Sequence, residues 1–514
     1  MSRTFVVGLD GASWRLLEPW IASGELPNLR ALREEGVWAG HNSCLPPVTF
    51  PNWKCYSSGK DPGGFGVYWF ERVDLEAGEI STIDSRDYRT AELWDYLNDE
   101  GYTTGVVNMP TMYPPREIDG PLVCGGPGTV EGEYRSIDSG YTHPEALATT
   151  LEREHEYEVH PDPLISSNEE RGEEVEAILD VLEQRFAVAL DLFERKELDL
   201  VHVTLFYLNV LHHFFWDEEP SKRAWTLVDE WIGRLKALDD VNLVIVSDHG
   251  SAPTTTEFYI NEWLAEHGYQ QRTQTVEDFL RPLGINRENV LALAKRAGLV
   301  DPLAAIVPER IQQLVPQSAG IKRARKLDAI DLDRTKAVAS SQGPIYINPA
   351  FDVDAVAEEL IADLESVRDS DGPLFTRVVR GSAVYSGPFT DEGPQVVVDQ
   401  RPGVHVNDGM GGGNVQTGPD RWAAENTPNG IFVAAGPDFD DRGEIDRISI
   451  LDVAPTLLAT FECDVPSDMR GEVLDVLVNQ PEFDQREPLA LDDRYDPGQS
   501  EKVTDRLEQL GYMS

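Results

Sequence analysis

Short apolar runs that lead into acidic residues constrain the fold of this chain more than any other feature of its sequence. Residues 4–9 form one such run, followed by Asp10, and residues 242–246 form another, followed by Ser247-Asp248-His249-Gly250. Runs at 103–108 and 199–206 have the same character, and helical patterns separate them. β-branched apolar runs are typical of parallel strands buried on both faces. Strands that alternate with helices predict an α/β fold.

The clearest helix is predicted before the strand at 199–206. Its apolar residues recur at helical spacing with acidic residues between them, at Val175, Ile178, Leu179, Leu182, Phe186 and Leu190. A helix with one apolar face covers one side of a sheet. Further apolar runs predict short buried strands in the second half of the chain, at 337–339, 345–347, 395–398 and 430–434.

Two stretches interrupt this pattern. Residues 125–169 are rich in Gly, Pro and acidic residues and predict a loop insertion, whereas residues 266–331 carry helical patterns and predict a helical insertion near the mouth of a site. We therefore expect one domain over 1–514, with a C-terminal tail and helix at 481–514. Its core segments are expected at about 1–124, 170–265 and 332–480.

The charge balance excludes some partners. The 514 residues include 44 basic and 91 acidic side chains, for a net charge of −47 at pH 7. A polyanion would be repelled, so we expect no binding to a nucleic acid polymer or an anionic membrane. The excess of acid, with 34 Arg and 10 Lys, resembles proteins of salt-loving organisms and predicts a halophilic protein.

Cysteine usage and hydropathy bear on location. The four cysteines contain no CxxC pair, which favours reduced, structural thiols. No run of about 18 apolar residues occurs, and no secretory signal pattern opens the chain. We expect a cytoplasmic protein without membrane insertion.

Asp10, Asp248 and His249 follow predicted strands directly. Ligands of open α/β sheets bind outside the carboxyl ends of the strands, so these side chains are candidates for one metal site. A carboxylate next to an imidazole suits Zn²⁺ or Mn²⁺ better than Ca²⁺. The alternative is that each Asp merely caps the turn after its strand.

Thr49 is the third element of the candidate site. It lies in Pro46-Pro47-Val48-Thr49-Phe50-Pro51, before a helical stretch, where it is expected to be the helix N-cap. A metal bound to its oxygen, together with the positive end of the helix, would favour the alkoxide and hold a phosphoryl group beside it. A Thr that only caps the helix is the alternative.

These residues belong to a wider set of motifs by which the chain resembles the type I phosphodiesterase and nucleotide pyrophosphatase family of the alkaline phosphatase superfamily. The motifs run over nearly the whole length and include Gly8-Leu9-Asp10-Gly11, Leu26-Pro27-Asn28-Leu29, Ser58-Gly59-Lys60-Asp61-Pro62, Val107-Asn108-Met109-Pro110, Ile260-Asn261-Glu262-Trp263-Leu264 and Asp452-Val453-Ala454-Pro455-Thr456. The resemblance implies an alkaline phosphatase-like fold, with a mixed, mostly parallel central sheet and helices on both faces.

The resemblance also implies a reaction. Members usually hold two divalent metals around a Thr or Ser nucleophile, so Asp10, Thr49, Asp248 and His249 are expected to form one metal site, with Thr49 as the nucleophile of a phospho-enzyme intermediate. The expected activity is hydrolysis of a small phosphate ester.

The second metal site departs from the family pattern. Asn209 stands where an Asp is expected four residues before His213, and Asn426 stands where a His is expected. Amides are weaker ligands for Zn²⁺ than carboxylates or imidazoles, so one metal site is expected and the second is in doubt. His212 or His405 could substitute, although ordinary packed or surface histidines are the alternative for both.

With one metal, other positive charge would have to hold the phosphoryl oxygens. Lys60 and Asn108 are expected to bind substrate, and Lys54 or the basic cluster at 322–326 could add charge, unless that cluster is a solvated helix face. Residues 66–70 lack the Asn with which nucleotide-hydrolysing relatives hold the phosphoryl oxygen, so nucleotide specificity is not carried over.

Two other classes of function stay open. One is transfer of a phospho-group to an acceptor, or sulfate-ester hydrolysis at a single metal. The other is a binding protein that kept the fold and one metal but lost turnover, because Asn209 and Asn426 leave the second site incomplete.

Overall fold

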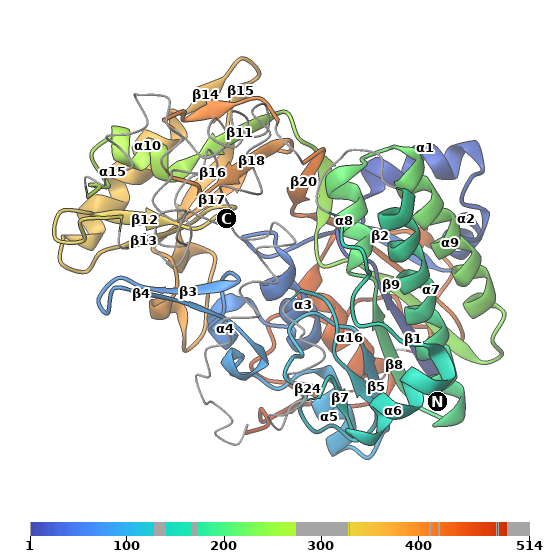
Figure 1. The fold of residues 1–514 in the computed structure, drawn as a ribbon. Helices are drawn as coiled ribbons and strands as arrows, with labels where there is room; N and C mark the ends of the chain where they lie inside the picture. Colours follow the sequence, from blue (N-terminus) through green and yellow to red (C-terminus); the bar gives the residue numbers. More distant parts are fainter. Residues whose placement is uncertain are drawn as a thin grey trace, which may run out of the picture.

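The structure is a computed structural model that describes residues 2–127, 140–165, 172–273, 327, 329–410, 413–419, 422–479, 481 and 483–490. A mixed, mostly parallel central sheet dominates it (Figure 1). Its strands follow the order β22-β2-β21-β9-β1-β8-β5-β6-β7, with β23 paired to β2. Their bounds are β1 Arg3–Gly8, β2 Val37–Asn42, β5 Thr104–Val107, β6 Leu122–Val123, β7 Thr142–His143, β8 Leu200–Thr204, β9 Val241–Val246, β21 Asn429–Ala435, β22 Gly443–Glu444 and β23 Ile448–Ser449.

The predicted strands at the centre of the sheet are confirmed. The runs at 4–9, 103–108, 199–206 and 242–246 correspond to β1, β5, β8 and β9, which are parallel neighbours. β21 runs antiparallel to β9, and β7 runs antiparallel to β6. The apolar runs are buried on both faces because helices cover both sides of the sheet.

Two groups of helices provide that cover (Figure 1). One group contains α1 Trp14–Ser23, α2 Pro27–Glu35, α7 Gly172–Arg195, α8 Tyr207–Phe214 and α9 Glu219–Lys236. The other contains α3 Thr49–Ser58, α5 Leu93–Asp99 and α16 Val453–Thr460. The members of each group contact one another. The helix predicted at 175–190 is α7. Its residues Val175, Ile178, Leu182 and Phe186 are buried, whereas Leu179 and Leu190 are half-buried.

A second, smaller core lies beside the main one. An antiparallel sheet of order β12-β13-β17-β16 packs against α15 Val353–Glu365, together with β11 Thr256–Tyr259, β18 Val404–Asn407 and α10 Ile260–Glu266. The sheet consists of β12 Ala337–Ala339, β13 Pro344–Ile347, β16 Phe375–Arg380 and β17 Val396–Gln400. The predicted strands at 337–339, 345–347 and 395–398 therefore exist, but only the run at 430–434 joins the central sheet, as part of β21.

Smaller elements complete the described chain. Short strands pair as β3 Glu71–Asp74 with β4 Glu79–Thr82, β10 Gly250–Pro253 with β20 Ala424–Thr427, β14 Arg368–Asp369 with β15 Gly372–Pro373, and β24 Val465–Pro466 with β25 Gln485–Arg486. β19 Gln416–Thr417 pairs with β11, and α4 spans Pro62–Phe65.

The predicted insertions fare differently. The prediction of a loop over 125–169 is wrong. Within this range β7 adds a strand to the central sheet, and α6 Ala146–His155 forms a helix with Leu147 and Leu151 buried. This helix was not predicted because Leu147 and Leu151 are its only buried residues, which gives a weak helical pattern in the sequence. Most of the predicted helical insertion, 274–326, lies outside the described residues, as do 491–514 of the predicted C-terminal tail and helix.

The register of the central strands places the candidate residues at one edge. Gly8 of β1 lies opposite Val246 of β9 and Thr204 of β8, so the three strands end at the same level. α3 approaches β1 closely at this edge, where a Cβ on Gly8 would lie 2.6 Å from Trp53 Cη2. The glycine therefore sets how near α3 and its first residue, Thr49, come to the ends of the strands.

This close approach predicts that Gly8→Ala lowers the free energy of unfolding by about 1–3 kcal/mol, because the new methyl group must displace the ring of Trp53. Denaturant unfolding followed by circular dichroism measures the effect. Gly172→Ala is the matched control, since a Cβ there has no neighbour within 4 Å. Equal midpoints for the two variants would contradict the proposed close packing.

Candidate active site

Three buried ligand atoms converge at the carboxyl edge of the central sheet. Asp10 follows β1, Asp248 and His249 follow β9, and one ligand atom from each lies within 4.8 Å of the others. The Nε2 atom of His249 lies 3.2 Å from Asp248 Oδ2 and 3.8 Å from Asp10 Oδ1. All three side chains have 0% exposure.

The tautomer of His249 decides what this cluster can hold. Its Nδ1 lies 3.0 Å from the carbonyl oxygen of Gly250, and therefore carries the proton that it donates. Burial lowers the pKa of His249 to about 4, so the ring is neutral at pH 7. The Nε2 lone pair then faces the carboxyl oxygens of Asp10 and Asp248, so each of the three groups offers a ligand atom.

The carboxylates show the same unmet need for positive charge. Asp10 Oδ1 and Asp248 Oδ2 are buried and, among the described residues, have no hydrogen-bond donor. Burial raises the pKa of Asp10 well above its usual range, and the charge of Asp248 raises it further. Burial also raises the pKa of Asp248 to about 8. A divalent cation would satisfy both orphaned oxygens and the Nε2 lone pair, so this donor set fits a metal.

Thr49 faces the same cluster. Its Oγ1 lies 3.4 Å from His249 Nε2, and its hydroxyl is near enough to both carboxyl groups to oppose the rise of their pKa. Thr49 is the first residue of α3, and Val48 occupies the N-cap position, so the expectation that Thr49 is the N-cap is wrong. Its hydroxyl is directed to the acidic cluster rather than to the amides of its own helix, which leaves the N-terminal amide groups of α3 available to an anion.

Two neighbours that the sequence analysis did not single out hold this cluster in place. The indole Nε1 of Trp53 donates to Asp10 Oδ2 at 2.9 Å, and the backbone amide of Gly11 donates to Asp248 Oδ1 at 3.1 Å. Each bond uses one carboxylate oxygen and leaves the other directed into the cluster. The sequence could have indicated Trp53, because it lies four residues after Thr49 and residues four apart share a helix face.

Asn209, His213 and Asn426 also come together, as the family pattern implied. Asn209 and His213 lie one turn apart on α8, and Asn426 lies on β20. Asn209 Nδ2 lies 3.2 Å from His213 Nε2 and 3.3 Å from Asn426 Oδ1. Ser251 Oγ, which the sequence analysis missed, lies 3.3 Å from Asn209 Oδ1 and donates to the carbonyl of Gly11 at 2.6 Å.

This second group is neutral and its polar atoms are largely paired with one another. His213 Nδ1 donates to the carbonyl of Ala424 at 2.8 Å, so its Nε2 accepts from the amide of Asn209. Burial lowers the pKa of His213 to about 4 and keeps it uncharged. With its imidazole nitrogen already hydrogen-bonded and no carboxylate among the three, this group does not fit a second Zn²⁺-type cation.

The two histidines considered as substitute ligands have other partners. His212 Nε2 accepts from the indole of Trp225 at 2.9 Å. His405 forms an ion pair with the buried carboxylate of Glu425. Neither donates a nitrogen to the group of Asn209, His213 and Asn426.

The residues predicted to bind substrate, and Lys54, have their described partners outside the Thr49 cluster. Lys60 forms an ion pair with Asp468, and Lys54 forms one with Glu92. The side-chain amide of Asn108 donates to the hydroxyl of Tyr157 and the carbonyl of Cys124. No hydrogen bond or ion pair joins these three residues to the Thr49 cluster within the described part of the chain. The basic cluster at 322–326 lies outside the described residues.

Comparison with known proteins now identifies the family. The model for "Type I phosphodiesterase / nucleotide pyrophosphatase" matches residues 4–422. The chain belongs to this family. Membership makes it a hydrolase that acts on phosphoesters, in a family that generally depends on divalent metal. No curated protein matches the sequence closely enough to count as a relative.

Solved structures confirm the fold. Phosphonoacetate hydrolase from Sinorhizobium meliloti 1021, solved with phosphonoformate, matches with a TM-score of 0.56 and 15% identity over 85% of this chain and 90% of that one. Human ectonucleotide pyrophosphatase / phosphodiesterase 5 matches with a TM-score of 0.54 and 13% identity over 93% of this chain and 100% of that one. An inactive murine counterpart, solved with AMP, has a TM-score of 0.51 and 12% identity over 89% and 94%. The predicted alkaline phosphatase-like architecture is therefore confirmed.

The cluster of orphaned acceptors predicts one tightly held Zn²⁺ or Mn²⁺ per chain after dialysis, measured by mass spectrometry of the metal. Asp248→Asn should lower the retained metal at least about tenfold, because it removes one charged ligand. Asp217→Asn, an exposed position whose carboxylate accepts a hydrogen bond from Trp20, is the control. Equal metal content in both variants would show that the ion binds elsewhere.

The neutral second group predicts a gain of metal when the family ligands are introduced. Asn209→Asp combined with Asn426→His should raise the metal content from one to two ions per chain, because a carboxylate and an imidazole replace two amides. Each single variant is the internal control, with a smaller gain. Two tightly held ions in the unaltered protein would refute the single-metal interpretation.

Proposed function

We propose that this protein hydrolyses a small phosphate ester at a single divalent metal, with Thr49 as the nucleophile. One observation carries the proposal: the Thr49 hydroxyl lies beside two buried carboxylates and an imidazole lone pair, which together form a set of ligands for a cation. Zn²⁺ and Mn²⁺ both suit this mixture of oxygen and nitrogen ligands. Asp10, Asp248 and His249 would hold the ion, with Thr49 as a fourth ligand.

The chemistry has two steps. The metal supplies positive charge that lowers the pKa of the threonine hydroxyl and offsets charge on the phosphoryl group. In the first step, Thr49 Oγ1 gives its proton to water and forms a bond to phosphorus, while the bond from phosphorus to the leaving oxygen breaks and the leaving group departs as an anion that takes a proton from water. In the second step, water attacks phosphorus and the Thr49 oxygen leaves, which regenerates the hydroxyl and releases the phosphoryl product.

The start of α3 assists both steps. Thr49 is the first residue of a ten-residue helix whose N-terminal amides are directed at the same region. The partial positive charge of a helix N-terminus favours the phosphoryl oxygens over water there. Trp53 and Gly11 keep Asp10 and Asp248 oriented throughout, since each donates to the carboxylate oxygen that does not face the cluster.

The second group would then act as a neutral clamp. Asn426 Nδ2 is buried and has no acceptor among the described residues, although its Oδ1 is fixed by the amide of Asn209. We propose that this amide donates to a non-bridging phosphoryl oxygen, in the place where a two-metal relative holds an ion. A hydrogen bond from an amide stabilises less charge than a dication, so the substrate should have a good leaving group.

The substrate is proposed to be a small phosphate ester in the cytoplasm. A net charge of −47 opposes a polyanionic substrate such as a nucleic acid. No helix within the described ranges has the length and hydropathy to cross a bilayer. The molecules named with the structural neighbours, phosphonoformate and AMP, are also small anions. The same composition motivates the proposal of a halophilic protein.

The neutral second group also favours a second class of function. A protein with one metal could transfer the phospho-group to an acceptor or hydrolyse a sulfate ester, or it could bind a phosphate ester without turnover. A screen of phosphate and sulfate esters, with and without alcohol acceptors, separates these: a transferase releases leaving group without stoichiometric phosphate, and a binding protein releases neither.

Thr49→Ala tests the proposed nucleophile. Turnover of bis(p-nitrophenyl) phosphate with Mn²⁺ or Zn²⁺ should fall about a thousandfold or more, because the hydroxyl proposed to form the covalent intermediate is removed. Thr376→Ala, at an exposed position on β16, is the matched control and should leave the rate unchanged. A Thr49→Ala rate close to that of the control would refute Thr49 as the nucleophile. It would not contradict the proposed metal site.

A further inference from the structure

A cavity lies away from the Thr49 cluster, around the other end of α3. It has a volume of about 600 Å³, and its lining shares no residue with the candidate metal site. Lys54, five residues after Thr49, lies on its wall and Lys60 follows the end of α3. Residues five apart on a helix lie on different sides of it, so one helix contributes to two separate sites.

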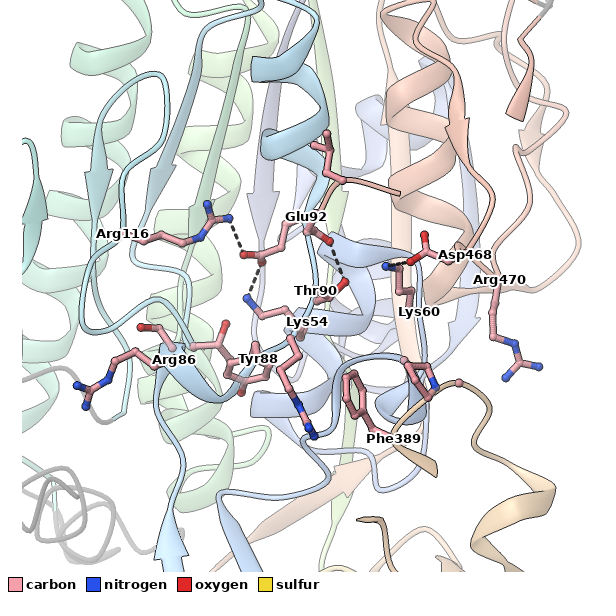
Figure 2. A pocket seen from close by; sticks show the side chains of 18 of the residues that line it. Lys54, Lys60, Arg86, Tyr88, Thr90, Glu92, Arg116, Phe389, Asp468 and Arg470 are labelled. Carbon is pink, nitrogen blue, oxygen red and sulfur yellow. Dashed lines mark hydrogen bonds and ion pairs between the residues drawn. The ribbon is translucent and has the colours of Figure 1, made fainter. Parts of the chain in front are cut away.

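The lining of this cavity is basic in an acidic protein. Only 44 of the 514 residues of the chain are basic, yet six of the twenty lining residues are. The lining contains two carboxylates, those of Glu92 and Asp468. Figure 2 shows Lys54, Glu92 and Arg116 on one side of the cavity and Lys60 with Asp468 on the other. The six basic residues are Lys54, Lys60, Arg86, Arg89, Arg116 and Arg470.

Carboxylates outside the lining hold several of these cations in place. Arg116 pairs with Asp95, Arg89 with Glu392, and Arg470 with Asp61. None of these three carboxylates lines the cavity. These ion pairs hold the three guanidinium groups in place and keep them charged, and Arg116 also pairs with Glu92 of the lining at 2.9 Å.

Lys54 has an unmet need for acceptors. Its side chain is 3% exposed, and its Nζ pairs with Glu92 Oε1 at 2.6 Å. Its other contacts are weak: the sulfur of Met112 at 3.9 Å and the ring of Tyr88 at 4.6 Å. An ammonium group has three N–H donors, and a thioether and a ring face are poor substitutes for oxygen acceptors.

Thr111 adds a buried donor to the same lining. Its side chain is 5% exposed, and its Oγ1 has no hydrogen-bond partner among the residues that the structure describes. Its backbone has a φ of +83°, a left-handed conformation that is unfavourable for a β-branched residue. Such strain persists where the surroundings impose it and is common at ligand sites.

Apolar side chains complete the cavity. Met112, Phe389 and Leu489 belong to its lining, and the guanidinium of Arg89 lies 3.5 Å from the centre of the Phe389 ring. The volume exceeds that of an inorganic ion and suits a small organic molecule. We infer that this cavity binds a small organic anion, with a phosphate-like head group at Lys54, Arg116 and Thr111 and a short apolar body against Phe389.

Binding of phenylphosphonate, which combines such a head group with a ring, tests the inference by calorimetry. The full chain is first stripped of metal and dialysed free of chelator, so that the candidate metal site cannot hold the probe through an ion. We expect one equivalent to bind, and inorganic phosphate to bind more weakly at the same site because it lacks the ring. Absence of saturable binding of either probe would overturn the inference.

Variants locate the site. Lys54→Met should weaken phenylphosphonate binding about tenfold, the effect of one charge-assisted hydrogen bond. Lys60→Gln gives a second reading in case Lys54→Met does not fold, as judged by circular dichroism. Arg30→Gln removes an exposed cation of α2 as the matched control and should change nothing.

Asp248→Asn separates this inference from the proposed function. It alters the candidate metal site, so phenylphosphonate should bind this variant as it binds the unaltered chain. Loss of binding in Asp248→Asn with retention in Lys54→Met and Lys60→Gln would place the anion at the Thr49 cluster and refute the cavity. Failure of Thr49→Ala to affect turnover has no bearing on this result.

Discussion

The convergence of three buried acceptors on one point organises the candidate active site of this protein. Asp10, Asp248 and the Nε2 lone pair of His249 face one another with no exposed surface. Such an arrangement is unfavourable by itself, because desolvated carboxylates repel each other and a neutral imidazole offers no proton to relieve them. The central sheet nevertheless enforces it, since β1 and β9 end in register and each is held by hydrogen bonds along its length. A cation resolves the conflict, and Thr49 is positioned to share it.

The neighbouring group shows how the same scaffold can be altered without being lost. Asn209, His213 and Asn426 occupy the places that the family pattern assigns to a second metal, yet they satisfy much of their hydrogen-bonding capacity among themselves. Replacing charged ligands by amides removes the repulsion that an empty site would create. The fold therefore accommodates this replacement. In the proposed mechanism, the stabilisation of charge falls on a single ion, the start of α3 and the amide of Asn426.

Helix α3 connects these features to the rest of the molecule. Its first residue faces the cluster, Trp53 one turn later orients Asp10, and Lys54 faces a different cavity whose lining is rich in fixed cations. Gly8 permits the helix to lie close enough to β1 for all of this to hold. One helix, α3, thus carries both the proposed nucleophile, Thr49, and a residue of the proposed anion site, Lys54.

Much of this could be predicted from the sequence. The apolar runs before Asp10 and Asp248 identified the central strands, and the family motifs pointed to Thr49 and to the altered second group. The prediction of the central strands succeeded because strand burial is encoded in neighbouring residues. The roles of Thr49 and of the second group stay predictions. The prediction that failed depended on distant partners, since β7 and helix α6 formed within an expected loop. The strands at 337–339 and 345–347 formed as expected, but the sequence did not indicate that they belong to a separate sheet.

The sequence by itself thus determined which side chains stand at the ends of the central strands and which ligands the second group lacks. Only the tertiary structure decided which nitrogen of His249 faces the carboxylates, that Lys60 turns to Asp468, and that Lys54 lies buried with too few acceptors. The physical reason is that hydrogen-bond direction and burial depend on the arrangement of the folded chain around each side chain, and no local sequence pattern records that arrangement.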